Sequence, residues 1–407
     1  MSLWIHSLSM NKDDPTLLII SHAGIKQINR AVFRHLSRSF SSLHVVIPES
    51  LTLSSGKQIQ AEEALPNDAP LIPLQLEGRS PRTYTYVGLT DTLNQVKPHV
   101  VILENDPVSR LGYNLAAWCR KNRAVLLCQS YENFRRGIIA SFKQRGVTGI
   151  LKSLPIHILN FVMAKKVDAL FVVNRESEKI FGEYGYRSIT RMPLGYDRQI
   201  FFTDTVSRNT YRKKVQVTEN ETVIAYFGRL VEQKGVHLLI EALAMMRDKP
   251  WKLLLDHIHD SSGSYVQRIQ EMITQYNLGE RVLYFEADHF EIANYMRAAD
   301  IMVAPSITTH DFKEQYGRAV QEAMACGCLC IVSDSGHLQD LVDDRSLIFK
   351  QNDVAALKNC LQPFLDDTSR RIACGSFLAK RAAENFTTEK QANIQTQVIL
   401  NLAERKR

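Results

Sequence analysis

Two glutamates stand eight positions apart in the segment EQYGRAVQEAMACG, at Glu314 and Glu322, and carboxylates so arranged can bind the hydroxyl groups of a ligand. A helix over this segment, stopped by Gly327, would carry both carboxylates near its amino-terminal end, where the helix dipole favours negative charge. The same pattern is typical of an exposed helix start, in which Glu314 and Arg318 form a surface pair. The neighbouring residues favour a ligand-binding interpretation.

An apolar run ends shortly before these glutamates. Ile301 to Ala304 is followed by Pro305 and a polar loop, and the apolar CLCIVS comes directly after Gly327, so the predicted order is strand, loop, helix, strand. In open α/β sheets, ligands bind beyond the carboxyl ends of the strands. We therefore expect both carboxylates to face a ligand.

The length and composition limit the class of protein. A chain of 407 residues is long enough for two domains of ordinary size. Its 45% hydrophobic and 23% charged residues suit a soluble globular protein, and no apolar run approaches the roughly 18 residues of a membrane span. Because residues 1–15 have no basic start and only a short, broken apolar stretch, we expect no signal peptide and a cytoplasmic location.

The seven cysteines are an odd number without disulfide spacing, which agrees with a reducing compartment. Cys326, Cys328 and Cys330 alternate closely. Zinc ligands usually come as two pairs, each two to four residues apart, so this spacing favours small buried positions over a metal site.

The net charge of +7 is unevenly distributed. The stretch from Arg135 to Lys166 holds seven Lys or Arg residues, no Asp or Glu, and many apolar side chains. It suits either the surface of an anionic membrane, peripheral at the inner face, or an amphipathic helix pair that packs on its own sheet. Because no stacking aromatics accompany the charge, we expect no nucleic acid partner.

Apolar runs separated by helix-length segments recur along both halves of the chain, which predicts two doubly wound α/β domains with parallel sheets. We expect an amino-terminal domain over residues 1–197 and a carboxyl-terminal domain over 198–385, with a final helix, 386–407, that packs back on the first domain. The polar, basic segment 198–220 has little apolar pattern and is interpreted as a linker.

The segment AYFGRLVEQKGVHLLIEAL and, about 75 residues later, VAPSITTHDFKEQYGRAVQEAMACGCLCIVSDSG resemble the retaining nucleotide-sugar glycosyltransferases of the GT-B fold, family 4 in particular. The resemblance implies two Rossmann-like domains that face each other across a cleft. Residues 1–197 would then bind the acceptor and residues 198–385 the nucleoside-diphosphate sugar donor.

The first motif of the resemblance implies that Arg229 and Lys234, with Gly228, bind the diphosphate of the donor. Fixed cations in a closed site stabilise the negative charge that develops on a departing nucleotide. They would replace a metal ion, so no metal and no other cofactor is expected.

The second motif implies that Glu314 binds hydroxyls of the donor sugar and Glu322 those of the nucleotide ribose. Backbone amides near Tyr316 and Gly317, at a helix amino terminus, would bind phosphate. Arg229, Lys234 and Glu314 are the expected catalytic residues.

In the first half, Gly24 occupies the place of the family's amino-terminal glycine loop and is expected at the donor. Gln129 stands where many members carry a histidine near the reacting carbon. The loops LENDP and QSYEN resemble a subgroup with acidic and amide residues there, so Glu104, Asp106, Gln129 and Glu132 are candidates for acceptor contact.

The chain departs from the family pattern at Leu329, where proline is usual, and at His337 and Asp340, where a second glycine and a glutamate are common. These changes spare the charged residues of the two motifs. They imply an active enzyme with an altered donor pocket.

The expected function is transfer of a sugar to a hydroxyl acceptor, a glycan or lipid-linked saccharide in polysaccharide or glycolipid biosynthesis. A sugar-nucleotide epimerase of the same fold and a catalytically silent sugar-nucleotide-binding protein remain alternatives. A nicotinamide-dependent oxidoreductase is disfavoured because neither half has G-x-G-x-x-G after its first strand. A paired-carboxylate hydrolase is disfavoured because no second acid pair stands out.

Overall fold

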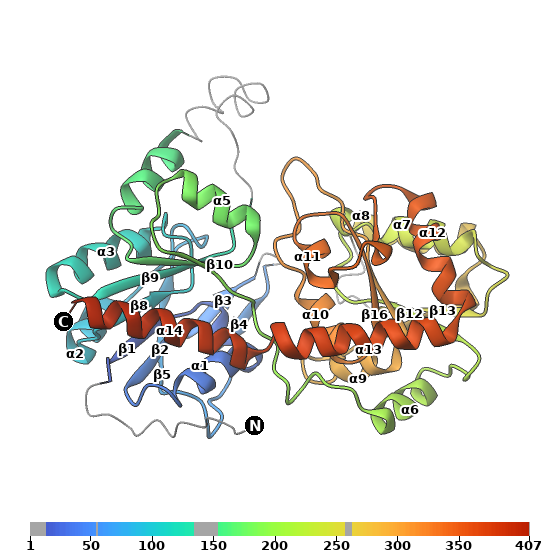
Figure 1. Cartoon of the computed structure of the whole chain (residues 1–407), viewed down its shortest axis with the longest axis horizontal. Helices are drawn as coiled ribbons and strands as arrows, with labels where there is room; N and C mark the ends of the chain where they lie inside the picture. Colours follow the sequence, from blue (N-terminus) through green and yellow to red (C-terminus); the bar gives the residue numbers. More distant parts are fainter. Residues whose placement is uncertain (1–13, 54–55, 134–153, 257–262, 407) are drawn as a thin grey trace, which may run out of the picture. The chain divides into compact units, whose positions relative to one another are not determined.

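The computed structural model describes residues 14–53, 56–133, 154–256 and 263–406. The chain forms two compact units (Figure 1): unit 1 contains residues 1–192 and 388–407, and unit 2 contains residues 193–387. The boundaries expected from the sequence lie a few residues away, after 197 and after 385. Residues 193–197 belong to unit 2 because Tyr196 forms a β-bridge with Thr387 and donates its N–H to Phe386 O over 2.9 Å.

Unit 1 is built on a parallel sheet, as the near-continuous apolar runs predict. Among the described residues its strand order is β11-β10-β9-β8-β1-β2-β5, and every neighbouring pair is parallel. Its strands are β1 (Leu17–Ile20), β2 (Leu43–Pro48), β5 (Leu71–Leu74), β8 (Val100–Leu103), β9 (Val125–Ser130), β10 (Ala169–Val172) and β11 (Ile189–Arg191). Two short antiparallel pairs accompany it: β3 (Ser50–Thr52) with β4 (Gln58–Gln60), and β6 (Leu76–Glu77) with β7 (Thr85–Tyr86).

Helices cover both faces of this sheet, because successive strand residues point to opposite sides. Leu18 belongs to the core beneath α2, α3 and α5, whereas Ile19 belongs to the core beneath α1 and α14. These helices are α1 (Ala31–Leu36), α2 (Leu89–Val96), α3 (Arg110–Asn122), α5 (Arg175–Glu183) and α14 (Thr388–Lys406), and a further helix spans 154–163. The carboxyl-terminal helix α14, red in Figure 1, lies beside α1 and buries Ile399 completely. It is part of unit 1.

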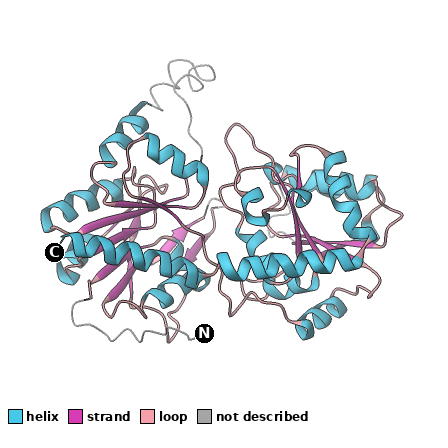
Figure 2. Cartoon of the chain, viewed as in Figure 1, coloured by secondary structure: helices cyan, strands magenta, loops and turns pink. Residues whose placement is uncertain are grey.

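Unit 2 repeats the architecture. Its parallel sheet has the order β14-β13-β12-β15-β16-β17 among the described residues. The strands are β12 (Thr222–Tyr226), β13 (Trp251–Asp256), β14 (Val282–Phe285), β15 (Ile301–Ala304), β16 (Leu329–Ser333) and β17 (Ile348–Phe349). Helices surround this sheet in Figure 2: α6 (Thr205–Lys214), α7 (Val236–Ala244), α8 (Ser264–Gln275), α9 (Ile292–Ala298), α10 (Arg318–Ala325), α11 (Leu338–Val342), α12 (Val354–Asp366) and α13 (Thr368–Asn385).

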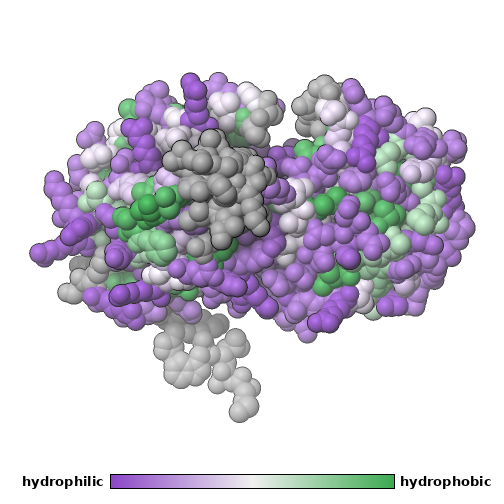
Figure 3. All heavy atoms as spheres, turned by 90° about the horizontal axis from the view of Figure 1, so that it is seen from above, coloured by the Kyte–Doolittle hydropathy of each residue, from purple (hydrophilic) through white to green (hydrophobic). Residues whose placement is uncertain are grey.

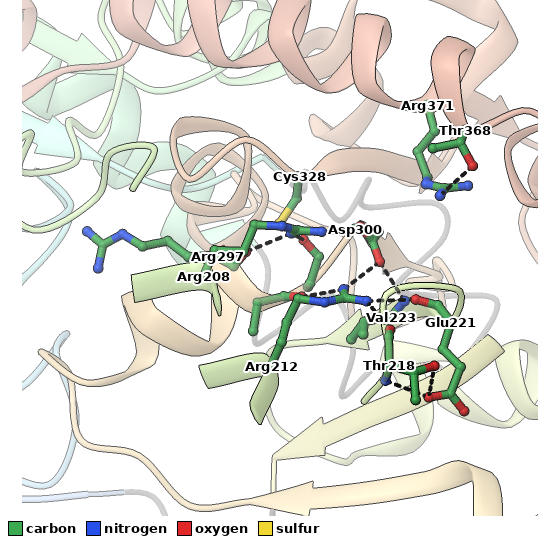
Figure 4. A network of polar contacts seen from close by, with 12 residues as sticks. Arg208, Arg212, Thr218, Glu221, Val223, Arg297, Asp300, Cys328, Thr368 and Arg371 are labelled. Carbon is green, nitrogen blue, oxygen red and sulfur yellow. Dashed lines mark hydrogen bonds and ion pairs between the residues drawn. The ribbon is translucent and has the colours of Figure 1, made fainter. Parts of the chain in front are cut away.

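The interpretation of residues 198–220 as a linker is wrong, because this segment contains helix α6, which packs on α9. Asp300 anchors it (Figure 4): Arg208 Nη2 lies 2.5 Å from Asp300 Oδ1, and Arg212 Nη1 lies 3.0 Å from Asp300 Oδ2. The backbone N–H of Val223 in β12 donates to the same carboxylate over 2.7 Å. The buried residue of α6 is Arg212, a partner of Asp300, so a search for apolar periodicity misses this helix.

Candidate functional site

The candidate site of unit 2 lies beyond the carboxyl ends of three adjacent strands, β12, β15 and β16. The loops that follow these strands include residues 227–235, 305–317 and 334–337. Hydrogen bonds join them: Ile307 N–H donates to Gln233 O over 2.8 Å, and His337 N–H donates to Glu314 O over 3.2 Å. We define the unit 2 site as Arg229, Lys234, Ser306, Glu314 and Glu322.

An ion pair joins the two motifs that the sequence singled out. Lys234 Nζ lies 2.5 Å from Glu314 Oε2, and Ser306 Oγ donates to the same oxygen over 2.9 Å. Lys234 Nζ also lies 5.1 Å from the ring centroid of Phe312. The Lys234 and Glu314 side chains are only 20% and 11% exposed, so their attraction is screened less than that of a surface pair.

The backbone of Glu314 is held by the loop that follows β16. Gly336 has a φ of +58°, and a Cβ at this position would lie 2.0 Å from Glu314 O. Only glycine combines this left-handed conformation with so close an approach. Gly336 was not among the predicted site residues, although the quoted motif contains it in SDSG.

Arg229 is exposed in the turn that follows β12. Its carbonyl oxygen accepts hydrogen bonds from Tyr226 Oη over 2.9 Å and from Val231 N–H over 3.1 Å, so the backbone of this turn is fixed. Gly228 precedes it, and a Cβ there would lie 3.0 Å from Tyr226 Oη. The structure thus positions Arg229 by its backbone and leaves the guanidinium open to solvent.

The helix of the second motif begins later than the sequence suggested. Helix α10 starts at Arg318, so Glu314 lies in the preceding loop and only Glu322 is on the helix. Gly317 has a φ of +89°, which is incompatible with a continuing helix, and a Cβ there would lie 2.6 Å from Leu338 Cδ2. Gly317 also provides no side chain to cap α10, so the amino-terminal turn is without side-chain capping.

Glu322 lies on α10 with a side chain that is 12% exposed. Burial raises the pKa of Glu322, and the charge of Arg318 offsets this rise in part. Arg318 Nη2 lies 3.5 Å from Glu322 Oε1, which is a long contact for an ion pair. A partly buried carboxylate with this limited pairing is suited to accept hydrogen bonds from a ligand.

Tyr316 has a structural side chain. It is 4% exposed, and its hydroxyl donates to Gln321 Oε1 over 3.0 Å. The amide of Gln321 in turn donates to Leu194 O. The predicted ligand contact of Tyr316 is therefore limited to its backbone.

In unit 1, the predicted acceptor residues lie at or just beyond the carboxyl ends of the adjacent strands β8 and β9. Asp106 accepts a hydrogen bond from Ser130 Oγ, and Arg82 Nη2 lies 3.7 Å from Glu132 Oε2. Burial raises the pKa of Asp106, whereas the bond from Ser130 and the charge of Arg82 act in the opposite direction. The structure thus joins Asp106 and Glu132 to a basic side chain, Arg82, that sequence reasoning missed.

Gln129 is 1% exposed at the end of β9. Its Nε2 donates to Tyr131 Oη over 2.7 Å, but its Oε1 is buried without a hydrogen-bond partner in the described part of the chain. A buried acceptor without a partner is costly, so this oxygen is suited to a donor group of a ligand or to water.

Gly24 lies in a short 3₁₀ helix after β1 and is buried, and a Cβ there would lie 2.9 Å from Ile47 Cγ2. The absence of a side chain at Gly24 is thus explained by packing against β2. Its donor contact stays a prediction.

Sequence reasoning also missed His22, which follows β1 in the stretch SHAG. His22 Nδ1 lies 2.8 Å from Tyr86 Oη, and Nε2 lies 3.5 Å from Asn105 Nδ2. Burial lowers the pKa of His22 to about 4. Burial also raises the pKa of Glu104 to about 7, against a hydrogen bond from Ser21. The signal that could have found His22 is its polar side chain two residues after the apolar strand β1.

The three closely spaced cysteines occupy small buried positions, as the sequence favoured. Their thiols lie near backbone carbonyls: Cys326 Sγ is 3.7 Å from Ala293 O, and Cys328 Sγ is 2.9 Å from Met296 O. Cys330 Sγ is 3.6 Å from Val320 O. Within the described ranges, no group of three or more His, Cys, Asp or Glu side chains is placed to hold a metal ion.

Part of the basic stretch 135–166, up to residue 153, lies outside the described residues. The described helix 154–163 exposes four large apolar side chains on its surface: Leu154, Ile158, Phe161 and Val162. No helix in the described portion of the chain is long and apolar enough to cross a membrane.

Residues 207–381 match the family model of glycosyl transferases group 1. Among curated proteins, the lipopolysaccharide core biosynthesis mannosyltransferase LpsB of Rhizobium meliloti is 25% identical over 47% of this chain and 55% of its own length. A D-inositol 3-phosphate glycosyltransferase of Corynebacterium kroppenstedtii is 31% identical over 40% of this chain and 37% of its own. The chain thus spans about half the length, or less, of these relatives.

Solved structures match over nearly the whole chain. A glycosyltransferase from Rickettsia africae has a TM-score of 0.73 at 14% identity, covering 97% of this chain and 99% of its own. Sucrose-phosphate synthase from Thermosynechococcus elongatus has a TM-score of 0.70 at 20% identity, covering 96% and 100%. Anabaena HepE, solved in complex with UDP and glucose, has a TM-score of 0.68 at 16% identity, covering 96% and 99%. These likenesses confirm the GT-B fold.

Proposed function

We propose that this chain, a GT-B protein whose residues 207–381 belong to the glycosyl transferases group 1, is a retaining glycosyltransferase that uses a nucleoside-diphosphate sugar. The observation that carries the proposal is the Lys234–Glu314 ion pair, which unites the two motifs beyond the carboxyl ends of the strands. The family 4 assignment, the retaining chemistry and the acceptor are parts of this proposal.

Arg229 and Lys234 bind the donor diphosphate. The Arg229 guanidinium is open to solvent while its backbone is fixed, and Lys234 is held beside Glu314. The amino-terminal turn of α10, which Gly317 leaves without a side-chain cap, adds backbone N–H groups and the positive end of the helix dipole. Because these groups supply the positive charge, the reaction requires no metal ion, and activity should persist when EDTA is added.

Glu314 and Glu322 bind the two polyols of the donor. Glu314 accepts hydrogen bonds from sugar hydroxyls, and Ser306 and Lys234 hold its carboxylate for that purpose. Glu322, four residues into α10, accepts from the ribose hydroxyls. Hydroxyl donors suit carboxylates that lie near a diphosphate, because they offset the repulsion between like charges.

In the reaction, the bond from the anomeric carbon to the diphosphate oxygen breaks and a bond to the acceptor oxygen forms on the same face. The acceptor hydroxyl gives its proton to the departing phosphate oxygen, so a separate carboxylate base is not needed. Lys234 and Arg229 stabilise the negative charge that develops on the leaving group.

The acceptor hydroxyl is bound by unit 1. The buried Oε1 of Gln129 accepts a hydrogen bond from it, and Glu104, Asp106 and Glu132 bind neighbouring hydroxyls. The acceptor is a glycan or a lipid-linked saccharide in polysaccharide or glycolipid biosynthesis. One curated relative is itself described as a lipopolysaccharide core mannosyltransferase, which is consistent with this class.

The protein works in the cytoplasm, at the inner face of the membrane. Hydrophilic side chains dominate the surface shown in Figure 3, with scattered apolar patches. Helix 154–163 adds exposed apolar side chains followed by the exposed Lys165 and Lys166, a combination that favours anionic lipid surfaces. Replacing Ile158 and Phe161 by serine should weaken sedimentation with anionic vesicles, whereas Val206→Ser, at a 76% exposed site, should not. Equal sedimentation of both variants would contradict the membrane contact.

The decisive test of function is calorimetric binding of UDP-, GDP- and ADP-sugars, starting with UDP-glucose because HepE was solved with UDP and glucose. One donor should bind the wild type, and Lys234→Ala should weaken it about tenfold to 100-fold through loss of a charged contact. Lys380→Ala, at a side chain that is 76% exposed, is the matched control and should bind normally. Absence of binding to every donor would overturn the proposal, and release of an isomerised free donor would favour an epimerase.

A further inference from the structure

We propose that His337 contacts the transferred sugar of the donor through Nε2 and helps to determine which sugar is accepted. The inference rests on the proposed function and assigns a new role at the same site. His337 is one of the positions at which the chain departs from the resembled family.

The backbone places His337 against the residue expected to bind the sugar. His337 N–H donates to Glu314 O over 3.2 Å, and the preceding Gly336 approaches Glu314 so closely that a Cβ would lie 2.0 Å from that oxygen. These contacts use only backbone atoms. The imidazole is therefore not needed to hold Glu314 in place.

A neighbouring aromatic side chain holds the ring of His337. It stacks on Tyr316 with a centroid distance of 5.1 Å and an interplanar angle of 25°. Tyr316 is itself fixed by its hydrogen bond to Gln321. The imidazole thus lies beside the segment that joins Glu314 to the start of α10, with a side chain that is only 10% exposed.

Asp340 sets the orientation of this ring. Asp340 Oδ2 lies 3.1 Å from His337 Nδ1, and the backbone oxygens of Asp340 and Leu341 accept from Arg381 over 3.0 Å and 2.7 Å. Because a carboxylate only accepts, Nδ1 must donate. In the neutral ring this makes Nε2 the acceptor.

An Nε2 acceptor distinguishes between the two parts of the donor. It repels phosphate oxygens, which are themselves acceptors, but it accepts a hydrogen bond from a sugar hydroxyl. A site that binds a hydroxyl in this way rejects a sugar whose hydroxyl points elsewhere, because the ring nitrogen then loses its partner. This hydrogen-bond chemistry favours a sugar hydroxyl over the diphosphate as the partner of Nε2.

The test compares binding of the best wild-type nucleotide sugar with binding of the nucleoside diphosphate alone. His337→Ala should weaken binding of the nucleotide sugar roughly fivefold to tenfold, the size of one hydrogen bond, and leave the nucleoside diphosphate unchanged. It should also reduce discrimination between donor sugars that differ at one hydroxyl. His337→Gln, whose amide also carries an acceptor oxygen, should recover part of the lost affinity.

Asp340→Asn tests the positioning role. It should raise the KM for the nucleotide sugar without changing affinity for the nucleoside diphosphate. Any fall in Tm should be too small to explain the higher KM. Equal weakening of both ligands in His337→Ala would show a diphosphate contact and overturn the inference. Unchanged sugar discrimination would also overturn it. If the wild type binds the nucleoside diphosphate but no sugar conjugate, or neither ligand, the proposed function itself fails.

Discussion

Breaking the Lys234–Glu314 ion pair should destabilise unit 2, and the magnitude follows from its geometry. Two unit charges 2.5 Å apart attract by about 6 to 7 kcal/mol at an effective dielectric constant of about 20, before desolvation is counted. Both side chains have lost most of their water, at 20% and 11% exposure, and this cost offsets much of the attraction. We expect a net coupling free energy of about 1 to 3 kcal/mol.

The assay is a double-mutant cycle with Lys234→Met and Glu314→Gln, which remove the charges while preserving side-chain length. Urea unfolding is followed by the fluorescence of Trp251, which is 1% exposed in unit 2, with Trp4 and Trp118 replaced by phenylalanine. Each single variant leaves a partly buried group without its partner, so the double variant should lose less stability than the sum of the two. A coupling free energy below about 0.5 kcal/mol would refute the reasoning, because it would mean that the pair behaves as an exposed one.

Three further predictions follow from the same structure. Glu322→Ala should weaken donor binding by about 1 to 3 kcal/mol, as measured by calorimetry, and unchanged affinity would remove the ribose assignment. Gly336→Ala should lower the free energy of unfolding by about 2 kcal/mol or more in urea titrations, whereas Gly182→Ala, which meets nothing within 4 Å in helix α5, should not; equal effects would contradict the close approach to Glu314. Because the folded-state pKa of Glu104 is about 7, above its ordinary 4.5, this group contributes less stability as the pH rises from about 4.5 to about 7, whereas His22, with its pKa lowered to about 4, contributes more. In urea titrations the stability of the wild type relative to Glu104→Gln should therefore fall over this pH range, and a constant difference between the two would contradict the raised pKa of Glu104.

The sequence was sufficient for the fold class. Near-continuous apolar runs separated by helix-length segments predict parallel sheets covered on both faces, because such strands are buried on both sides. The two linked motifs carry the resemblance to GT-B glycosyltransferases. The match over residues 207–381 and the structural likenesses confirm this resemblance. Glu314 and Glu322 were singled out from residue type and spacing, whereas Arg229 and Lys234 were named from the resemblance.

Two features of unit 2 could not be predicted from the sequence: the packing of helix α6 and the backbone conformation of Gly317. Helix α6 was interpreted as a linker because its packing depends on ion pairs between Arg208, Arg212 and Asp300, which no hydrophobic period reveals. The start of α10 was placed too early because Gly317 adopts a left-handed conformation, with a φ of +89°, which a helix cannot continue through.

The residue types at the site were determined by the sequence, and so were the strands that precede them. The tertiary structure alone decided which side chains meet: Lys234 with Glu314, His337 with Tyr316 and Asp340, and Asp106 with Ser130. The physical reason is that hydrogen bonds and ion pairs act over a few ångströms, whereas partners such as Lys234 and Glu314 are 80 residues apart along the chain. Only the parallel sheet brings the ends of their strands to one edge.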